Sequence, residues 1–317
     1  MQKINIKIFA TIIFLCFLVP VASRAAAYDF YVDKNSIELT ENGNALFPWK
    51  TIGAVLSHIQ SEGLKKKTVY IKNGTYFESL SISNNTKLVG ESKSETIVDG
   101  TGNDNAVKFV STKSEIKNLK IKNADATNIV VDRRSKATIT GCNIEKAGKF
   151  GVEVKESSAA EKYKFTISNS KISENGSQGM FISKRKIKIS DNEIFSNDEE
   201  GVDLHSRVKG TVAGNDIHGN GESGIESMLA GANLTIRNNE VENNHTQGIT
   251  IQVYSTGKKG KVKISGNTIR GNHKYGIRFA NYTRSIGPKK FRVFADKYIK
   301  LSKNTISDND SGKFVYE

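Results

Sequence analysis

The sequence predicts an all-β protein, folded as a single-stranded right-handed parallel β-helix with a short N-terminal capping helix. Three observations lead to this fold class: an internal repeat of 22 to 24 residues, alternation of polar and apolar residues with period 2 inside each copy, and Asn and Gly at fixed places in each copy. Each copy is then one coil of short strands. Successive coils stack about 4.8 Å apart and pair through their backbones.

The repeat is clearest in the second half of the chain. It reads Ile-x-x-Asn-x-Ile-x-x-Asn, then a short turn and Gly-Ile/Val-x-hydrophobic, and its clear copies run from Ile189 to Gly312. β-Branched runs such as 186–189 alternate with period 2, whereas a helical repeat would be longer and show a period of 3.6 residues. Earlier copies are degenerate at the first Asn position, which is taken by Leu119, Cys142 and Ser170.

Each residue type in the repeat has an expected structural role. Inward Ile and Val side chains are expected to stack on their copies in adjacent coils and form a continuous core. The Asn side chains are expected to form amide ladders from coil to coil. The Gly before each Ile or Val, as at Gly201, is expected to turn the chain with a positive φ. Cys142 is expected to be a buried small residue and not a reactive thiol.

The chain is expected to comprise a signal peptide at 1–27 and one β-helix domain at 28–317. Basic residues precede an apolar run, and small residues at 25–27 offer a cleavage site. An uncleaved N-terminal anchor is the alternative. This organisation predicts a secreted or periplasmic/extracellular protein with no integral membrane segment after signal removal. It also leaves Cys142 as the lone cysteine, so no internal disulfide is expected.

The two ends of a β-helix expose strand edges that invite association. Ile52, Val55 and Ile59 fall on one face of a helical stretch that begins at Pro48 and ends near Gln60. We expect this helix to cover the first coil. The sequence shows no comparable cap at the C-terminal end.

The charge balance indicates an anionic partner. The formal net charge is +14, and the signal segment carries three basic residues and no acidic one, so the remaining chain has 14 − 3 = +11. For an exported protein this predicts an acidic polysaccharide or cell-surface glycan as partner, and no nucleic acid, because no nucleic-acid motif is present. A generally basic surface with no specific partner is the alternative.

Several segments resemble the N-terminal signature of the pectin lyase-like superfamily, namely 31–33, 48–52, 69–78 and 88–91. The Asn- and Gly-rich repeats that follow are similar to the right-handed β-helix repeats of that superfamily. The resemblance covers nearly all of the chain after the signal peptide and implies the fold. It does not fix the activity, because this fold hosts lyases, epimerases, hydrolases, esterases and non-enzymatic proteins. Glu78 lies in a Gly-x-Tyr-x-Glu segment similar to one of pectin methylesterases, and we interpret it as structural.

One segment resembles an enzyme motif more closely. Gly201-Val202-Asp203-Leu204-His205 is similar to the Gly-Ile-Asp-Pro-His segment of mannuronan C5-epimerases. The resemblance implies that Asp203 and His205 occupy active-site positions. This chain departs from the motif in having Glu200 where such enzymes often have Tyr, Leu204 in place of Pro, and Ser206 in place of a second acid.

A site around this pair is also plausible from the repeat. Asp203 and His205 are two apart on one strand, so both side chains are expected to point outward on the same face. Three insertions, at about 155–164, 254–261 and 281–297, leave from the same corner of their coils and would wall a groove with this pair on its floor. The second and third insertions are rich in basic residues: Lys258, Lys259, Lys261, Arg284, Lys289, Lys290 and Arg292.

The predicted chemistry is proton abstraction at C5 of a uronate. The expected catalytic residues are Asp203, His205 and Arg207, with His205 as the base. The expected substrate-binding residues are Lys184, Glu226, Gln252, Tyr254 and Arg278. No metal site and no certain cofactor are predicted, with calcium at the acidic turn 198–203 as an alternative. The structural alternative is that outward strand positions are polar simply because they face water.

Two functions of different class follow from the sequence. The first is an exported enzyme that acts on acidic polysaccharide by uronate lyase or C5-epimerase chemistry, favoured by the Asp203/His205 pair and the basic loops. The second is a non-catalytic surface or periplasmic β-helix that binds glycan or a partner protein, favoured by the departures from the epimerase motif.

Overall fold

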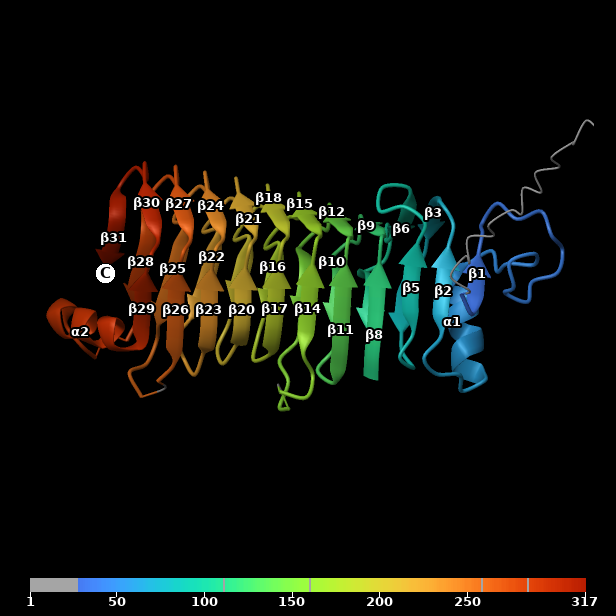
Figure 1. The fold of residues 1–317 in the computed structure, drawn as a ribbon, viewed down its shortest axis with the longest axis horizontal. Coiled ribbons are helices and arrows are strands. Elements are labelled where there is room, and N and C mark those ends of the chain that lie inside the picture. The colour runs from blue at the N-terminus through green and yellow to red at the C-terminus, as the bar shows by residue number, and fades with distance from the viewer. Residues whose placement is uncertain (1–27, 111, 160, 258, 284) are drawn as a thin grey trace, which may run out of the picture.

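Short parallel strands stack in three columns and form a β-helix along the long axis of the molecule (Figure 1). The computed structural model describes residues 28–317 except 111, 160, 258 and 284. The predicted signal peptide, 1–27, lies outside the described residues. The described chain contains two α-helices, one near each end of the β-helix (Figure 1).

The three sheets, named A, B and C here, are followed in turn within each coil. Sheet A contains β1 Phe30–Val32, β2 Thr68–Ile71, β5 Lys87–Gly90, β8 Thr112–Lys117, β11 Ser135–Thr140, β14 Phe165–Ser168, β17 Lys186–Ser190, β20 Lys209–Ala213, β23 Asn233–Arg237, β26 Lys261–Ser265 and β29 Ile299–Ser302. Sheet B contains β3 Gly74–Phe77, β6 Thr96–Asp99, β9 Lys120–Lys122, β12 Asn143–Glu145, β15 Lys171–Ser173, β18 Glu193–Phe195, β21 Asp216–His218, β24 Glu240–Glu242, β27 Thr268–Arg270 and β30 Thr305–Ser307. Sheet C contains β4 Leu80–Ile82, β7 Asn105–Phe109, β10 Thr127–Val131, β13 Phe150–Val154, β16 Met180–Ile182, β19 Val202–Leu204, β22 Ile225–Met228, β25 Ile249–Val253, β28 Tyr275–Asn281 and β31 Gly312–Tyr316.

The core consists of columns of equivalent residues, as the repeat predicts. In sheet B, Ile172, Ile194 and Ile217 pair in register from one coil to the next and are fully buried. Corresponding columns of Ile, Val and Leu line the inner faces of sheets A and C. Cys142 is fully buried in this interior, and burial raises the pKa of its thiol to about 12, so the thiol stays protonated.

Two asparagine ladders run along the corners of the β-helix and confirm the expected role of the repeat Asn residues. In one ladder, Asn192 Nδ2 donates to Asn215 Oδ1 and Asn215 Nδ2 to Asn239 Oδ1, each at 2.9 Å. In the other, Asn220 Nδ2 donates to Asn244 Oδ1 at 2.9 Å and also to the Ile194 carbonyl at 3.1 Å. The ladders satisfy amides that are buried from water, which would otherwise be costly.

The glycines before the sheet C strands are needed for a different reason from the expected one. Gly201 and Gly224 are absent from the glycines with positive φ, so the expected left-handed turn is wrong for them. A Cβ on Gly201 would lie 2.8 Å from the Gly224 carbonyl oxygen and 2.9 Å from Asn220 Nδ2. Adjacent coils therefore approach too closely at this corner for any side chain. A positive φ occurs instead before the ladder, as at Gly214 with φ +68.

The N-terminal helix caps the β-helix as predicted. Helix α1, Ile52–Ser61, buries Ile52, Val55 and Ile59 in the core, and the Thr51 hydroxyl accepts a hydrogen bond from the Ala54 N–H at its start. The Glu78 carboxylate accepts hydrogen bonds from the backbone N–H groups of Ile52 and Gly53, at 2.9 and 2.6 Å. A carboxylate at a helix N-terminus is stabilising, which accords with the structural interpretation of Glu78.

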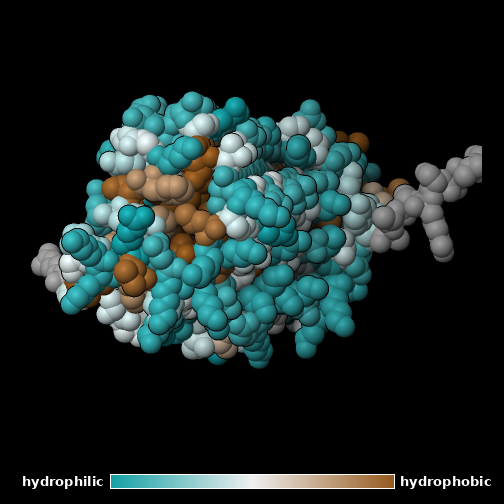
Figure 2. All heavy atoms as spheres, turned by 60° about the vertical axis from the view of Figure 1, so that its left-hand side comes forward, coloured by the Kyte–Doolittle hydropathy of each residue, from teal (hydrophilic) through white to brown (hydrophobic). Residues whose placement is uncertain are grey.

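The expectation of an uncapped C-terminal end is wrong. Helix α2, Pro288–Tyr298, covers this end and buries Phe291 and Ala295 against the core (Figure 1). It lies in the third predicted insertion, which is therefore an end cap and not a groove wall. Hydrophobic side chains remain exposed around this end (Figure 2). The sequence does not reveal this cap, because the helix has only two fully buried residues, Phe291 and Ala295, and many basic ones.

A fully buried arginine fixes the first insertion. Arg185 is 0% exposed, and its Nη atoms donate to five backbone carbonyl oxygens, including those of Lys155 at 2.7 Å and Tyr163 at 3.0 Å. Burial lowers the pKa of Arg185 to about 10, so it stays charged at neutral pH. The carbonyl oxygens therefore stabilise this cation and tie both ends of the insertion to the coil below.

Replacing this arginine should be costly. Arg185→Met keeps an apolar stem but leaves the buried carbonyl groups without donors, so we expect the free energy of unfolding to fall by about 3–5 kcal/mol in urea titrations. Arg134→Met, at an exposed position of the neighbouring turn, is the matched control and should change little. Equal stability of the two variants would contradict a stabilising role for the carbonyl cluster.

Candidate functional site

The candidate site lies on the outer face of sheet C. Phe181, Asp203, Glu226, Thr250 and Arg278 pair in register across β16, β19, β22, β25 and β28. This is the column that the repeat predicts. Because adjacent strands are about 4.8 Å apart, the side chains of this column are held next to one another.

Asp203 and His205 form an ion pair, with His205 Nε2 3.1 Å from Asp203 Oδ2. The hydrogen bond that His205 Nε2–H donates to the Asp203 carboxylate raises the pKa of His205. The His205 ring also packs against Phe181 at a tilt of 54°, with 4.6 Å between ring centroids. Asp203 thus occupies Nε2 and leaves Nδ1 as the second ring nitrogen available for proton transfer.

Asp203 is far more buried than expected. The sequence predicts an outward, solvated carboxylate, but Asp203 is only 5% exposed. Phe181 and Glu226 flank it in the adjacent coils, and His205 lies against it within its own coil. Side chains packed on the outer face therefore remove water from this carboxylate.

The pKa of Glu226 is unusually high for a carboxyl group. Burial, together with the nearby charges of Asp203 and Glu222, raises the pKa of Glu226 to about 7, although His205 and Arg278 act in the opposite direction. A carboxyl group in this state is partly protonated at neutral pH. It can then both donate and accept protons under physiological conditions.

Glu200 is a member of the site that the sequence interpretation missed. It is 5% exposed, and its Oε2 accepts a hydrogen bond from Gln178 Nε2 at 2.9 Å. Burial and a hydrogen bond with Glu222 raise the pKa of Glu200 well above its ordinary value. The sequence showed only a departure from the epimerase motif here. One feature of the sequence could have indicated this residue. Gln178 and Glu200 occupy the same point of successive coils, directly before Gly179 and Gly201, so their side chains are expected to be neighbours.

Aromatic rings lie on both sides of the carboxylates. Phe150 stacks on Phe181 at 5.2 Å between centroids, and Phe181 also packs at a tilt against His205. On the other side, Tyr254 stacks on Tyr282 at 4.8 Å, and these rings are 49% and 41% exposed. Burial and the nearby charges of Glu226 and Asp203 contribute to raising the pKa of Tyr254. Exposed rings beside polar groups suit the mixed apolar and polar faces of a sugar.

The remaining predicted substrate-binding residues on sheet C are close to the carboxylates. Gln252 is 8% exposed and follows Met228 in the neighbouring column. Arg278 acts on Glu226 electrostatically, and its Nε lies 2.6 Å from Glu317 Oε1. Gln252 lies one coil beyond Glu226, on β25, and Arg278 lies two coils beyond it, on β28, so both lie on the same face as Glu226.

The predicted residues in the turns are less closely associated with the site. Lys184 Nζ lies 4.0 Å from Glu156 Oε1, so it faces the first insertion. Arg207 is exposed in the turn that follows His205, and within the described chain it makes no ion pair with Asp203. The structure therefore brings Asp203, His205 and Glu226 together but leaves Arg207 at the margin.

The first two predicted insertions do leave from the same corner. They follow β13 and β25 of sheet C, on either side of the coils that carry Asp203 and Glu226. Lys258 and Arg284, which were expected among the basic residues of the loops, lie outside the described residues.

Two carboxylates of the acidic turn 198–203 accept hydrogen bonds from side chains of the preceding coil. Glu199 Oε2 accepts from Ser177 Oγ at 2.7 Å, and Glu200 accepts from Gln178. Across the part of the chain that the structure describes, no three His, Cys, Asp or Glu side chains converge as metal ligands. His245 and His273 stack at 5.1 Å between centroids on successive turns.

The raised pKa of Glu226 predicts a pH dependence of stability. Between the ordinary Glu value of about 4.3 and about 7, the native state binds more protons than the unfolded state, so the free energy of unfolding falls as pH rises through this window. Glu226→Gln should therefore melt at a higher temperature than wild type at about pH 8 and at a similar temperature at about pH 4. Glu62→Gln, at an exposed position, is the control. A wild-type-like pH dependence in Glu226→Gln would exclude this role.

Solved structures with similar folds come from several kinds of protein. The A-module of a mannuronan C-5 epimerase from Azotobacter vinelandii is 18% identical, with a TM-score of 0.52, over 90% of this chain and 97% of that one. A pectate lyase is 13% identical, with a TM-score of 0.58, over 89% and 77% of the two chains. An alginate lyase from Paenibacillus sp. is 16% identical, with a TM-score of 0.55, over 84% and 95%. At these identities the likeness establishes the fold, which is of the pectin lyase-like type.

The family assignment comes from the repeats. No curated protein matches the sequence. Residues 101–259, half of the chain, match the model of the family described as right handed beta helix region. This stretch contains the two asparagine ladders' central coils and the Asp203–His205 pair. The chain therefore belongs to the right-handed β-helix family.

Proposed function

We propose that the protein acts on an acidic polysaccharide by proton transfer at the carbon next to a uronate carboxylate, as a lyase or a C5-epimerase. The observation that carries this proposal is the Asp203–His205 ion pair beside Glu226, a carboxyl group whose pKa is about 7. Structural neighbours that are lyases or epimerases support it at the level of the fold.

Both reactions share their first step. A base removes the proton at C5, and the electron pair of that C–H bond moves into the adjacent carboxylate, which becomes enolate-like. In an epimerase the carbon is reprotonated from the opposite face. In a lyase the electron pair returns to form a double bond, and the glycosidic oxygen at C4 leaves with a proton.

His205 is the proposed base. Asp203 holds Nε2, so the lone pair at Nδ1 is free to accept the proton. The raised pKa makes His205 a stronger base, but it also requires a higher pH for deprotonation. Activity should therefore rise with pH on the acidic side as His205 loses its proton.

The carboxyl groups of the site would repel a uronate if they were all ionised. Protonated Glu226 removes one of these charges and can donate a hydrogen bond to the substrate carboxylate. Arg278 supplies positive charge on the same face. Glu200 stands where the epimerase motif often has Tyr, and its raised pKa gives it a proton to donate in place of the phenol.

The proposed location is outside the cytoplasm, secreted or periplasmic/extracellular, on the basis of the predicted signal peptide. In the described chain, neither helix is long and apolar enough to cross a membrane. No nucleic-acid partner is proposed.

The role of His205 can be tested directly by substitution. His205→Ala should abolish turnover, a loss of at least about 10²-fold, in assays that follow unsaturated uronate absorbance and proton NMR of polyuronates. The chain offers a matched control in His218, which lies in a second Asp-x-His pair on sheet B, 4.0 Å from Asp216 and stacked on Phe195. His218→Ala should keep full activity. Full activity of His205→Ala, or equal loss in both variants, would exclude the assignment.

The role of Glu226 can be separated from that of His205. Loss of the Glu226 proton should reduce activity above about pH 7, through a higher KM for the anionic substrate. Glu226→Gln keeps a hydrogen-bond donor at all pH values and should lose this alkaline decline. An unchanged alkaline limb would show that another group causes it, and loss of kcat at every pH would show that Glu226 transfers the proton itself.

A second candidate function is non-catalytic glycan binding. The exposed Tyr254–Tyr282 stack favours it, because stacked rings can hold a sugar without any acid–base group. Binding that is lost in Tyr254→Ala, with no product from folded wild-type protein, would support this function over the enzyme.

A further inference from the structure

A second face of the β-helix carries a concentration of positive charge. The outward positions of β17, β20, β23, β26 and β29 in sheet A contain no acidic residue. Their basic residues are Lys186, Lys188, Lys209, Arg237, Lys261, Lys263 and Lys300. Sheet A is separate from sheet C, so this face differs in place and in charge from the candidate site.

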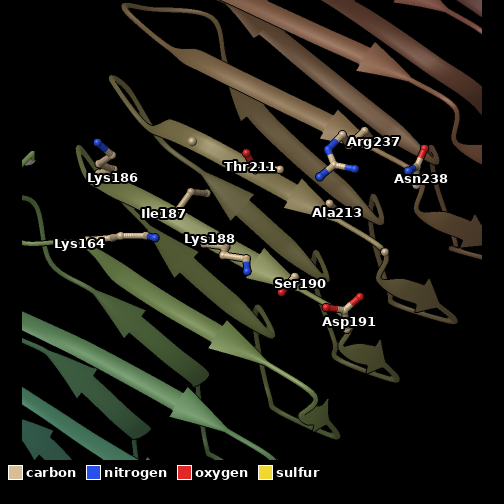
Figure 3. Close-up of a pocket in the computed structure, with 12 residues that line it drawn as sticks. Lys164, Lys186, Ile187, Lys188, Ser190, Asp191, Thr211, Ala213, Arg237 and Asn238 are labelled. Atoms are coloured by element: carbon tan, nitrogen blue, oxygen red, sulfur yellow. The ribbon is translucent and has the colours of Figure 1, made fainter.

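The basic face contains a hollow of about 470 Å³. Its floor is made by the small residues Thr211 and Ala213 of β20, while Lys188 on one neighbouring strand and Arg237 on the other stand on its two sides (Figure 3). Gly210 also lines it and has φ +127, and a Cβ there would lie 2.1 Å from the Ile187 carbonyl oxygen. The hollow is therefore built into the strand by residues without bulky side chains.

The cations on the rim are available for a ligand. Lys186 and Lys209 pair with Glu161, at 3.0 and 3.2 Å. Lys188 and Arg237 have no carboxylate within ion-pair distance among the residues that the structure describes. Their charges are thus not neutralised inside the protein, and bound anions would meet them across an open, polar surface.

The composition of the hollow selects among anionic ligands. Most of its exposed lining is basic or carries hydroxyl and amide groups, including those of Thr211, Ser190 and Asn238, which can bond sugar hydroxyls. Of the described residues that line it, Asp191 is the one carboxylate, against the four cations Lys164, Lys186, Lys188 and Arg237. The lining contains no aromatic residue on which a nucleobase could stack, and its sole large apolar side chain, Ile187, is 2% exposed. An anionic membrane would likewise find no apolar group to insert.

We propose that this hollow and the flanking lysines of sheet A bind a linear anionic polysaccharide, at a site separate from the Asp203–His205 pair. The coils repeat about every 4.8 Å along the face, a spacing close to that of successive sugars in an extended chain. Lys188 and Arg237 contact the acidic groups, Arg237 through its two-pronged guanidinium, and Thr211 and Ser190 contact the hydroxyls. The inference does not depend on catalysis at sheet C.

The test uses charge reversal at the rim of the hollow. Lys188→Glu/Arg237→Glu is compared with Lys93→Glu/Lys313→Glu, which makes the same change in net charge at exposed positions away from the hollow. Binding is measured by calorimetry at low ionic strength in a His205→Ala background, so that no turnover interferes. The probes are polygalacturonate, heparin, neutral dextran, duplex DNA and phosphatidylserine vesicles.

We expect the sheet A variant to weaken binding of the anionic polysaccharides by about tenfold and the control variant to change it by less than about twofold. Dextran should not bind.

Equal losses in the two variants would overturn the proposal, because net charge alone would then explain binding. Tighter binding of DNA or vesicles than of either polysaccharide, lost in the sheet A variant, would overturn the ligand class. Lys188→Gln/Arg237→Gln should weaken binding of the same anionic polysaccharides by a smaller factor than the charge reversal does. A melting curve like that of wild type confirms that each variant is folded.

Discussion

Stacking of each coil on the next in a fixed parallel register is the constraint on which the whole structure depends. Among the described residues, each strand of the three sheets pairs only with strands of adjacent coils, so the backbone bonds of the sheets are made to the coils before and after. The register places equivalent positions directly over one another. Isoleucine then lies on isoleucine in the core, and asparagine bonds asparagine at the corners. The same constraint removes the side chain at Gly201, where adjacent coils touch.

This register also creates the chemistry of the candidate site. Residues that point outward from adjacent coils cannot move apart, because the strands that carry them are hydrogen-bonded. Asp203 and Glu226 are therefore held as neighbours, and Phe181 flanks Asp203 from the preceding coil. Like charges held close together and away from water raise the pKa of a carboxyl group, which is what Glu226 shows. The stability of the stacked coils thus sustains an arrangement that would be unfavourable by itself.

The sequence predicts features that depend on a position that recurs in every repeat. It does not predict features that depend on contacts between side chains at different positions of adjacent coils. The coils, the Asn ladders, the column from Phe181 to Arg278 and helix α1 all follow from spacing and periodicity. The burial of Asp203 and the protonation of Glu200 depend on side chains from three coils, which no single motif contains. Helix α2 was missed because only Phe291 and Ala295 mark its buried face. Glycine is required both where two coils approach closely and where φ is positive. The sequence alone therefore cannot tell which of these two reasons applies at Gly201.

Two faces of one solenoid carry different groups, acid–base side chains on sheet C and, among the described residues, the unpaired cations Lys188 and Arg237 on sheet A. In the proposed function, a uronate chain reacts over Asp203 and Glu226. The most direct measurement is a crystal structure of His205→Ala with a bound oligouronate. We expect a sugar between Phe181 and Tyr254, with its carboxylate toward Glu226 and Arg278. An oligouronate bound in an ordered way elsewhere, with the sheet C face empty, would contradict the proposed function.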